Sequence, residues 1–126
     1  MNRRSQRPVF LNLWQIRLPV TGVTSILHRL DGVLLTLLEP LLIGLLSLSA
    51  TAEGYARLGG WLDSLWLRLV VLALTWVLAH HACAGVRFLL LDLGLGLDKP
   101  QARRSAWAVH AAALSLTLYA AVRLLG

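Results

Sequence analysis

The chain has 126 residues, of which 57% are hydrophobic and only 14% are charged. A soluble domain has about a quarter of its residues charged, so this composition excludes an ordinary water-exposed globular domain and indicates a membrane protein. The formal net charge is +6, but the basic residues flank apolar stretches, a pattern of membrane topology rather than of nucleic-acid binding.

Residues 1–24 form a basic segment before the first apolar stretch. The sequence RPVFLNLWQIRLPV places apolar and aromatic side chains between Arg7 and Arg17, with Pro8 and Pro19 near its ends. Proline marks turns and boundaries, and an apolar stretch flanked by arginines can lie along a membrane surface. We therefore expect residues 1–24 to be a cytoplasmic, interfacial segment rather than a membrane span.

Three apolar stretches follow and account for most of residues 25–126. Each is long enough for an α-helix to cross a bilayer, which takes about 20 apolar residues. The first is too long for a cleavable signal peptide, so we expect it to be retained. The predicted fold class is all-α, an integral membrane protein with three transmembrane helices in one bundle. The predicted spans lie at about residues 25–49, 67–91 and 106–125.

The basic residues also predict the orientation of these helices. Arginines are concentrated in residues 1–24, and the connection between the second and third stretches carries Lys99, Arg103 and Arg104. The connection between the first and second stretches has one arginine and two acidic residues. Because positively charged connections stay on the cytoplasmic side, we expect the N-terminus and the second connection to face the cytoplasm.

Polar residues of the first stretch fall on one helical face. At 100° per residue, the face contains Ser25, His28, Gly32, Leu35 and Glu39, with Arg29 at its border. Such a face is not expected to contact lipid, so we expect it to contact protein or a cofactor. Glu39 lies about 15 Å deeper than Arg29 along the helix. We expect its carboxyl to be protonated or hydrogen-bonded within the bundle.

The second stretch ends in HHACAGVRFLLLDLG, which begins with His80 and His81. His81 and Gly85 lie one turn apart on the same helical face. Imidazole is an axial ligand of haem iron, and a glycine one turn away leaves room for a flat macrocycle. Cations for the haem propionates are available from His28, Arg29 and Arg87. The pattern also fits a helix-packing contact, and the residues alone leave both interpretations open.

Ser25 and Arg29 lie one turn apart near the start of the first stretch. A hydroxyl and a guanidinium can hold the carbonyl oxygens of a quinone and stabilise the negative charge that forms on its reduction. The alternative is that Ser25 caps the helix and Arg29 extends to the membrane surface. Both interpretations stay open at this level.

Two segments together resemble a known family. RPVFLNLWQIRLPVTGVTSILHRLDG contains Ser25, His28-Arg29 and Gly32, and HACAGVRFLLLDLG contains the pattern H-x-x-x-G-x-R-x-x-x-x-D from His81 to Asp92. With the three-span layout, they resemble the cytochrome b membrane-anchor subunit of succinate dehydrogenase (succinate:quinone oxidoreductase, respiratory complex II). The resemblance covers nearly the whole chain.

The resemblance implies a subunit that is not an enzyme on its own and has no catalytic residue. It would anchor a flavoprotein subunit and an iron–sulfur subunit on the cytoplasmic face of a bacterial inner membrane, where electrons from succinate reduce a quinone. It would share one haem b with a second small anchor subunit. By this resemblance His81, rather than His80, is the iron ligand. Haem binding would also involve His28, Arg29 and Gly85, and quinone binding Ser25 and Arg29.

Four residues depart from the family pattern or lie outside it. Asp31 stands where a small serine or threonine is usual, which would add a carboxylate near the quinone pocket. Phe88 stands where a histidine is frequent, so any propionate or proton-transfer role of that histidine is missing or moved. His110 lies outside the motifs, and Glu39 has no role that the resemblance assigns.

Two other functions are compatible with parts of this pattern. One is a haem-free structural anchor or assembly protein that holds soluble subunits at the membrane. The other is a transporter subunit in which Glu39 and His28 relay protons. Succinate oxidation by this chain itself is not expected, because it has neither a dinucleotide-binding glycine motif nor a cysteine cluster for iron–sulfur centres.

Overall fold

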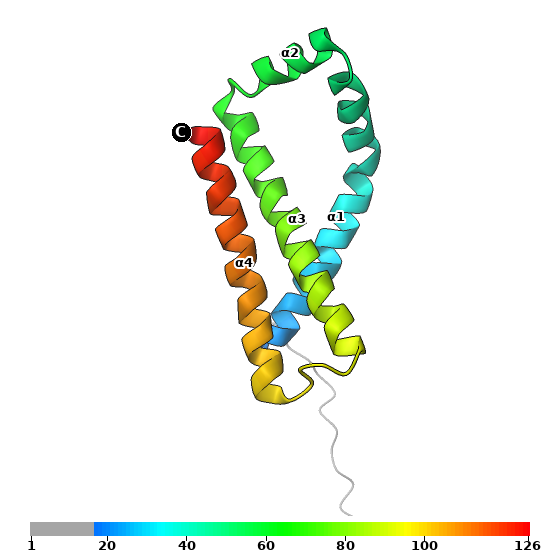
Figure 1. Ribbon diagram of the computed structural model, residues 1–126, viewed down its shortest axis with the longest axis vertical. Helices are drawn as coiled ribbons and strands as arrows, with labels where there is room; N and C mark the ends of the chain where they lie inside the picture. The colour runs from blue at the N-terminus through cyan, green and yellow to red at the C-terminus, as the bar shows by residue number, and fades with distance from the viewer. Residues whose placement is uncertain (1–16) are drawn as a thin grey trace, which may run out of the picture.

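The computed structural model describes residues 17–126, and within them all regular structure is helical. Three of the helices are long and apolar enough to cross a membrane, which confirms the all-α prediction. The four helices, shown in Figure 1, are α1 (Val20–Ser49), α2 (Ala52–Trp61), α3 (Leu65–Asp92) and α4 (Lys99–Leu125). The interfacial segment proposed for residues 1–24 falls mostly on residues 1–16, which lie outside the described part.

Two helices begin before the apolar stretches that predicted them. α1 starts at Val20, directly after Pro19, whose backbone is extended and whose carbonyl accepts from Gly22 and Val23 N–H. α4 starts at Lys99, with Pro100 in its first turn. Proline fits the first turn of a helix because its missing N–H has no partner there in any case. Each of these helices therefore starts within one residue of a proline, whereas hydropathy locates only the apolar part of the helix that is suited to lipid.

The short helix α2 was not predicted from the sequence. It connects α1 to α3 at the end of the molecule opposite the α3–α4 connection (Figure 1). Thr51 caps its first turn, because its hydroxyl oxygen accepts from Gly54 N–H at 3.1 Å. A Cβ atom on Gly54 would lie 1.9 Å from the carbonyl oxygen of Leu48. Only glycine therefore allows α2 to fold back this tightly against the end of α1.

We expect Gly54→Ala to destabilise this connection, since overpacking against backbone typically costs about 1–3 kcal/mol. Gly59→Ala on the same helix is the matched control. A Cβ there meets nothing within 4 Å, and alanine favours a helix over glycine by about 1 kcal/mol. The thermal unfolding midpoint of the purified protein in detergent should fall for Gly54→Ala and hold or rise for Gly59→Ala. Equal midpoints would contradict this account of the turn.

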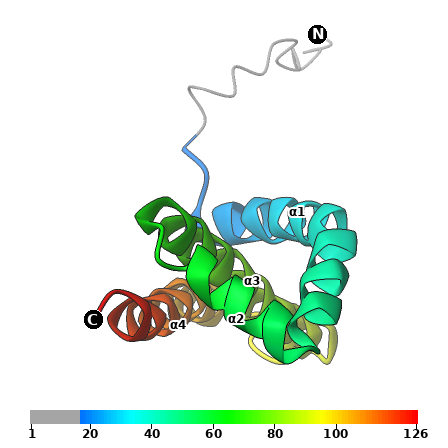
Figure 2. The ribbon, with the colours of Figure 1, turned by 90° about the horizontal axis from the view of Figure 1, so that it is seen from above.

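Helices α3 and α4 lie antiparallel and close together, and α1 crosses them near its own N-terminal end and then diverges (Figures 1 and 2). Among residues 17–126 the buried apolar side chains are small, and alanines 84, 106 and 113 are 0% exposed. Small residues let membrane helices approach closely. Most large apolar side chains are instead exposed on the helix surfaces, where lipid or partner subunits can cover them.

Candidate functional site

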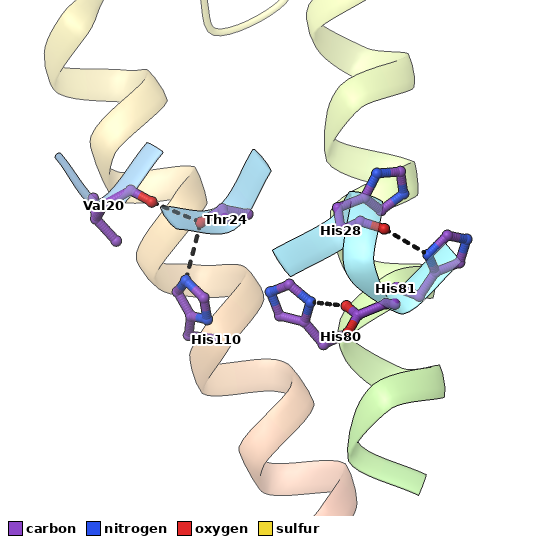
Figure 3. Close-up of polar contacts among 7 residues, drawn as sticks. Val20, Thr24, His28, His80, His81 and His110 are labelled. Atoms are coloured by element: carbon purple, nitrogen blue, oxygen red, sulfur yellow. Dashed lines mark hydrogen bonds and ion pairs between the residues drawn. The ribbon is translucent and has the colours of Figure 1, made fainter. Parts of the chain in front are cut away.

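His28 of α1 and His81 of α3 form a stacked pair where the two helices cross (Figure 3). Their ring centroids are 4.4 Å apart and the rings are inclined by 9°. His81 Nδ1 lies 3.3 Å from the backbone carbonyl oxygen of His28. A carbonyl only accepts, so Nδ1 carries the proton in this long hydrogen bond and Nε2 keeps a free electron pair.

Two glycines allow these rings to approach the opposite helices. A Cβ on Gly32 of α1 would lie 3.2 Å from Cε1 of His81, and a Cβ on Gly85 of α3 would lie 3.5 Å from Nε2 of His28. Gly85 was expected to leave room for a macrocycle. The structure instead places the His28 ring against it. The open space at this crossing lies on the α1 side, beside Gly32.

An open groove runs along α1 beside the stacked rings and has a volume of about 550 Å³. Arg29 contributes to its wall and is exposed, whereas Ser25, one turn earlier, is half-buried and is not part of the lining. The structure therefore brings His28, Arg29 and His81 together. The residues that line the groove are His28, Arg29, Gly32, Val33, Thr36, Leu37 and His81.

His80 points to the other side of α3, into the bundle. It is 0% exposed, and its Nδ1 donates to Oδ2 of Asp31 at 2.5 Å. Its ring stacks on Trp76 and on His110 at centroid distances of 5.1 and 5.0 Å. Asp31 therefore faces the interior of the bundle, whereas the comparison with the family pattern had placed its carboxylate near the quinone pocket.

A second hydrogen bond extends this group. Thr24 Oγ1 donates to the carbonyl of Val20 at 2.9 Å, so it accepts from His110 Nε2, also at 2.9 Å (Figure 3). We name Thr24, Asp31, His80 and His110 the polar cluster; it joins α1, α3 and α4. The sequence contained one signal for it, because Thr24 and Asp31 are seven residues apart and so share a face of α1.

Arg87 turns toward α4 instead of the stacked histidines. Its Nε donates to Ser105 Oγ at 2.9 Å and its Nη2 donates to the Ala102 carbonyl at 3.1 Å. The side chain is only 6% exposed. It therefore ties α3 to α4 in this chain. The neighbouring Phe88 packs against His28, with 5.1 Å between ring centroids.

Glu39 is exposed on α1, and this helix diverges from α3 beyond its N-terminal part (Figure 1). The expectation that its carboxyl lies within the bundle is wrong for this chain taken alone. The prediction assumed that one face of α1 stays against the bundle along its whole length. The structure shows that this holds near Asp31 and Gly32 and fails beyond them.

Comparison with known proteins identifies the family. The family model for the succinate dehydrogenase/fumarate reductase transmembrane subunit matches residues 3–120. The succinate dehydrogenase cytochrome b556 subunit of Paracoccus denitrificans is 33% identical over 116 residues, 91% of this chain and 89% of that protein. The subunit of the same name from Coxiella burnetii is 36% identical over 107 residues, 83% of this chain and 86% of its own length.

A more distant relative also matches most of the chain. The succinate dehydrogenase cytochrome b556 subunit of Rickettsia prowazekii is 26% identical over 114 residues, 90% of each chain. These matches and the three long apolar helices describe a multi-pass membrane protein. The resemblance found in the sequence motifs is thereby confirmed, and the chain belongs to the succinate dehydrogenase/fumarate reductase transmembrane subunit family, whose cytochrome b anchor subunits are its relatives.

Proposed function

We propose that this chain is the membrane-anchoring cytochrome b subunit of a succinate dehydrogenase complex, that it binds haem b through His81, and that it contributes Ser25 and Arg29 to a quinone site. The observation that carries the haem assignment is the hydrogen bonding of the two ring nitrogens of His81. Its Nδ1 proton is held by the His28 carbonyl, and its Nε2 is free. Histidines that bind metals typically donate their second N–H in this way, which fixes the ring for coordination.

The residues around His81 fit haem b in position and chemistry. The groove beside the ring takes in His28 and Arg29, which can pair with propionates. Gly85 acts indirectly, since it lets the His28 ring lie against α3 and stack on His81. Bound haem would supply one-electron transfer. The groove is open on its outer side, which supports a second anchor subunit as the other wall and the source of the second ligand.

The quinone site would lie at the N-terminal end of α1. Ser25 and Arg29 are one turn apart there, and Arg29 is exposed. Hydrogen bonds from a hydroxyl and a guanidinium to the quinone oxygens favour the reduced form, because they stabilise the negative charge that forms on these oxygens during reduction. The distribution of basic residues supports a cytoplasmic location for this end, in a bacterial inner membrane. Flavoprotein and iron–sulfur subunits docked on that face would deliver electrons directly to the quinone.

The visible spectrum and haem content of the purified complex test this proposal. We expect one haem b for each pair of anchor subunits, with the spectrum of a low-spin, bis-histidine iron. The competing function, a haem-free structural anchor, predicts an assembled complex without any haem absorption. Such a colourless but fully assembled complex would reject the cytochrome assignment while leaving the family membership intact.

A further inference from the structure

Two adjacent residues of α3 meet two adjacent residues of α1 at the helix crossing. His80 donates to the carboxylate of Asp31, and the ring of His81 packs on Gly32, where a Cβ would lie 3.2 Å away. The two histidines leave α3 in different directions, since consecutive residues are separated by about 100° around a helix. His80 enters the bundle, and His81 lies beside the open groove.

The His80 side chain is tightly held. It is 0% exposed, and Trp76 and His110 stack on it. His110 is itself fixed by the hydrogen bond from its Nε2 to Thr24. The single polar contact of the His80 ring is the Nδ1 bond to Asp31, because Nε2 is buried without a partner among residues 17–126. Loss of the carboxylate would leave both ring nitrogens buried and unpartnered, which is costly in an apolar surrounding.

His81 is held more weakly than its neighbour. It is half-buried, and its own polar contact is the long, 3.3 Å bond to the His28 carbonyl. Fixing His80 fixes the rotation of α3 about its axis at this level. That rotation sets the direction in which His81 leaves the helix.

We infer that Asp31 is a positioning residue for His81: by holding His80 it sets the rotation of α3 and so the orientation of the imidazole that binds iron. The inference rests on the proposed function, because it takes His81 to be the haem ligand. The Asp31 carboxylate is hydrogen-bonded to His80 rather than to His81, and Asp31 is not one of the residues that line the groove. It acts through the His80 contact, and the rest of the polar cluster holds His80 from its other face.

The test uses the assembled, haem-containing complex and its low-temperature EPR spectrum, which reports the orientation of the axial imidazoles, together with a redox titration of the haem. Asp31→Ala should shift the largest g value and the midpoint potential while haem content stays close to wild type. Asp31→Asn keeps an acceptor for His80 Nδ1–H and should restore the wild-type signal. Glu39→Gln, a carboxyl removed from the exposed surface of the same helix, is the matched control and should change neither readout.

His80→Phe provides a second, independent variant should Asp31→Ala fail to assemble. A phenyl ring keeps the stacking on Trp76 and His110 but removes the bond to Asp31, so the same shift is expected. A wild-type EPR signal in Asp31→Ala or His80→Phe would overturn the inference, as would an Asp31→Asn complex that behaves like Asp31→Ala. A wild-type complex without haem would instead reject the proposed function, so the two failures are distinct.

Discussion

Replacement of His81 by alanine is expected to remove haem from the assembled complex, whereas replacement of the adjacent His80 by phenylalanine is expected to leave it bound. Of these two adjacent histidines, only His81 lines the groove, and the one hydrogen bond of its ring is made by Nδ1. His80 is 0% exposed and its Nδ1 is committed to Asp31, so a planar cofactor cannot reach it. Because even outer contacts of a metal ligand contribute about 10–100-fold to metal affinity, loss of the ligand should lower haem content more than about tenfold.

The measurement is haem content by pyridine haemochrome, expressed per flavin so that assembly and haem loading are separated. His80→Phe is the matched control because it removes an imidazole one residue away on the same helix. Loss of haem in His80→Phe with retention in His81→Ala would assign the ligand to His80 and reverse the site. Retention of haem in both would place the ligand outside this pair.

The parts of the fold that follow from local sequence were predictable. A membrane span depends on the length and hydropathy of one continuous segment, so the three long helices could be located from residues 25–126 alone. The short helix α2 could not, because its sequence AEGYARLGGW has three glycines and little apolar character. It is stabilised by the Thr51 cap and by the close contact of Gly54 with α1, and that contact exists only once the chain has turned back.

The candidate site likewise has features that the sequence predicted and features that it did not. The spacing of His28 and Gly32 on one helical face predicted that this face contacts protein or a cofactor rather than lipid. The partners of His80 and Arg87 were not predicted, because Asp31 and Ser105 belong to other helices and their approach depends on how the three helices cross. A sequence pattern shows which residues share a face of one helix. It does not show which neighbouring helix that face meets, or how far along its length the contact lasts, as Glu39 illustrates.

Replacement of Arg29 by leucine is expected to lower succinate-driven quinone reduction by about 100-fold, the lower end of the effect of removing one preorganised hydrogen-bond donor. Succinate oxidation with an artificial dye is expected to stay at the wild-type rate. Arg29 is exposed beside the groove and has no ion pair among residues 17–126, so its removal leaves no buried acid without a partner and should not unfold the subunit. Dye reduction does not require the membrane quinone site, and it therefore reports assembly and electron delivery separately.

Two further variants make the Arg29 experiment specific. Arg29→Lys keeps the charge but loses the planar, two-pronged donor, so an intermediate rate is expected. Arg57→Leu removes an exposed arginine from α2, at the opposite end of the molecule, and should leave both activities unchanged. If Arg29→Leu lowers quinone and dye reduction equally, Arg29 serves to assemble the complex, and the hydrogen bond to the quinone must come from elsewhere.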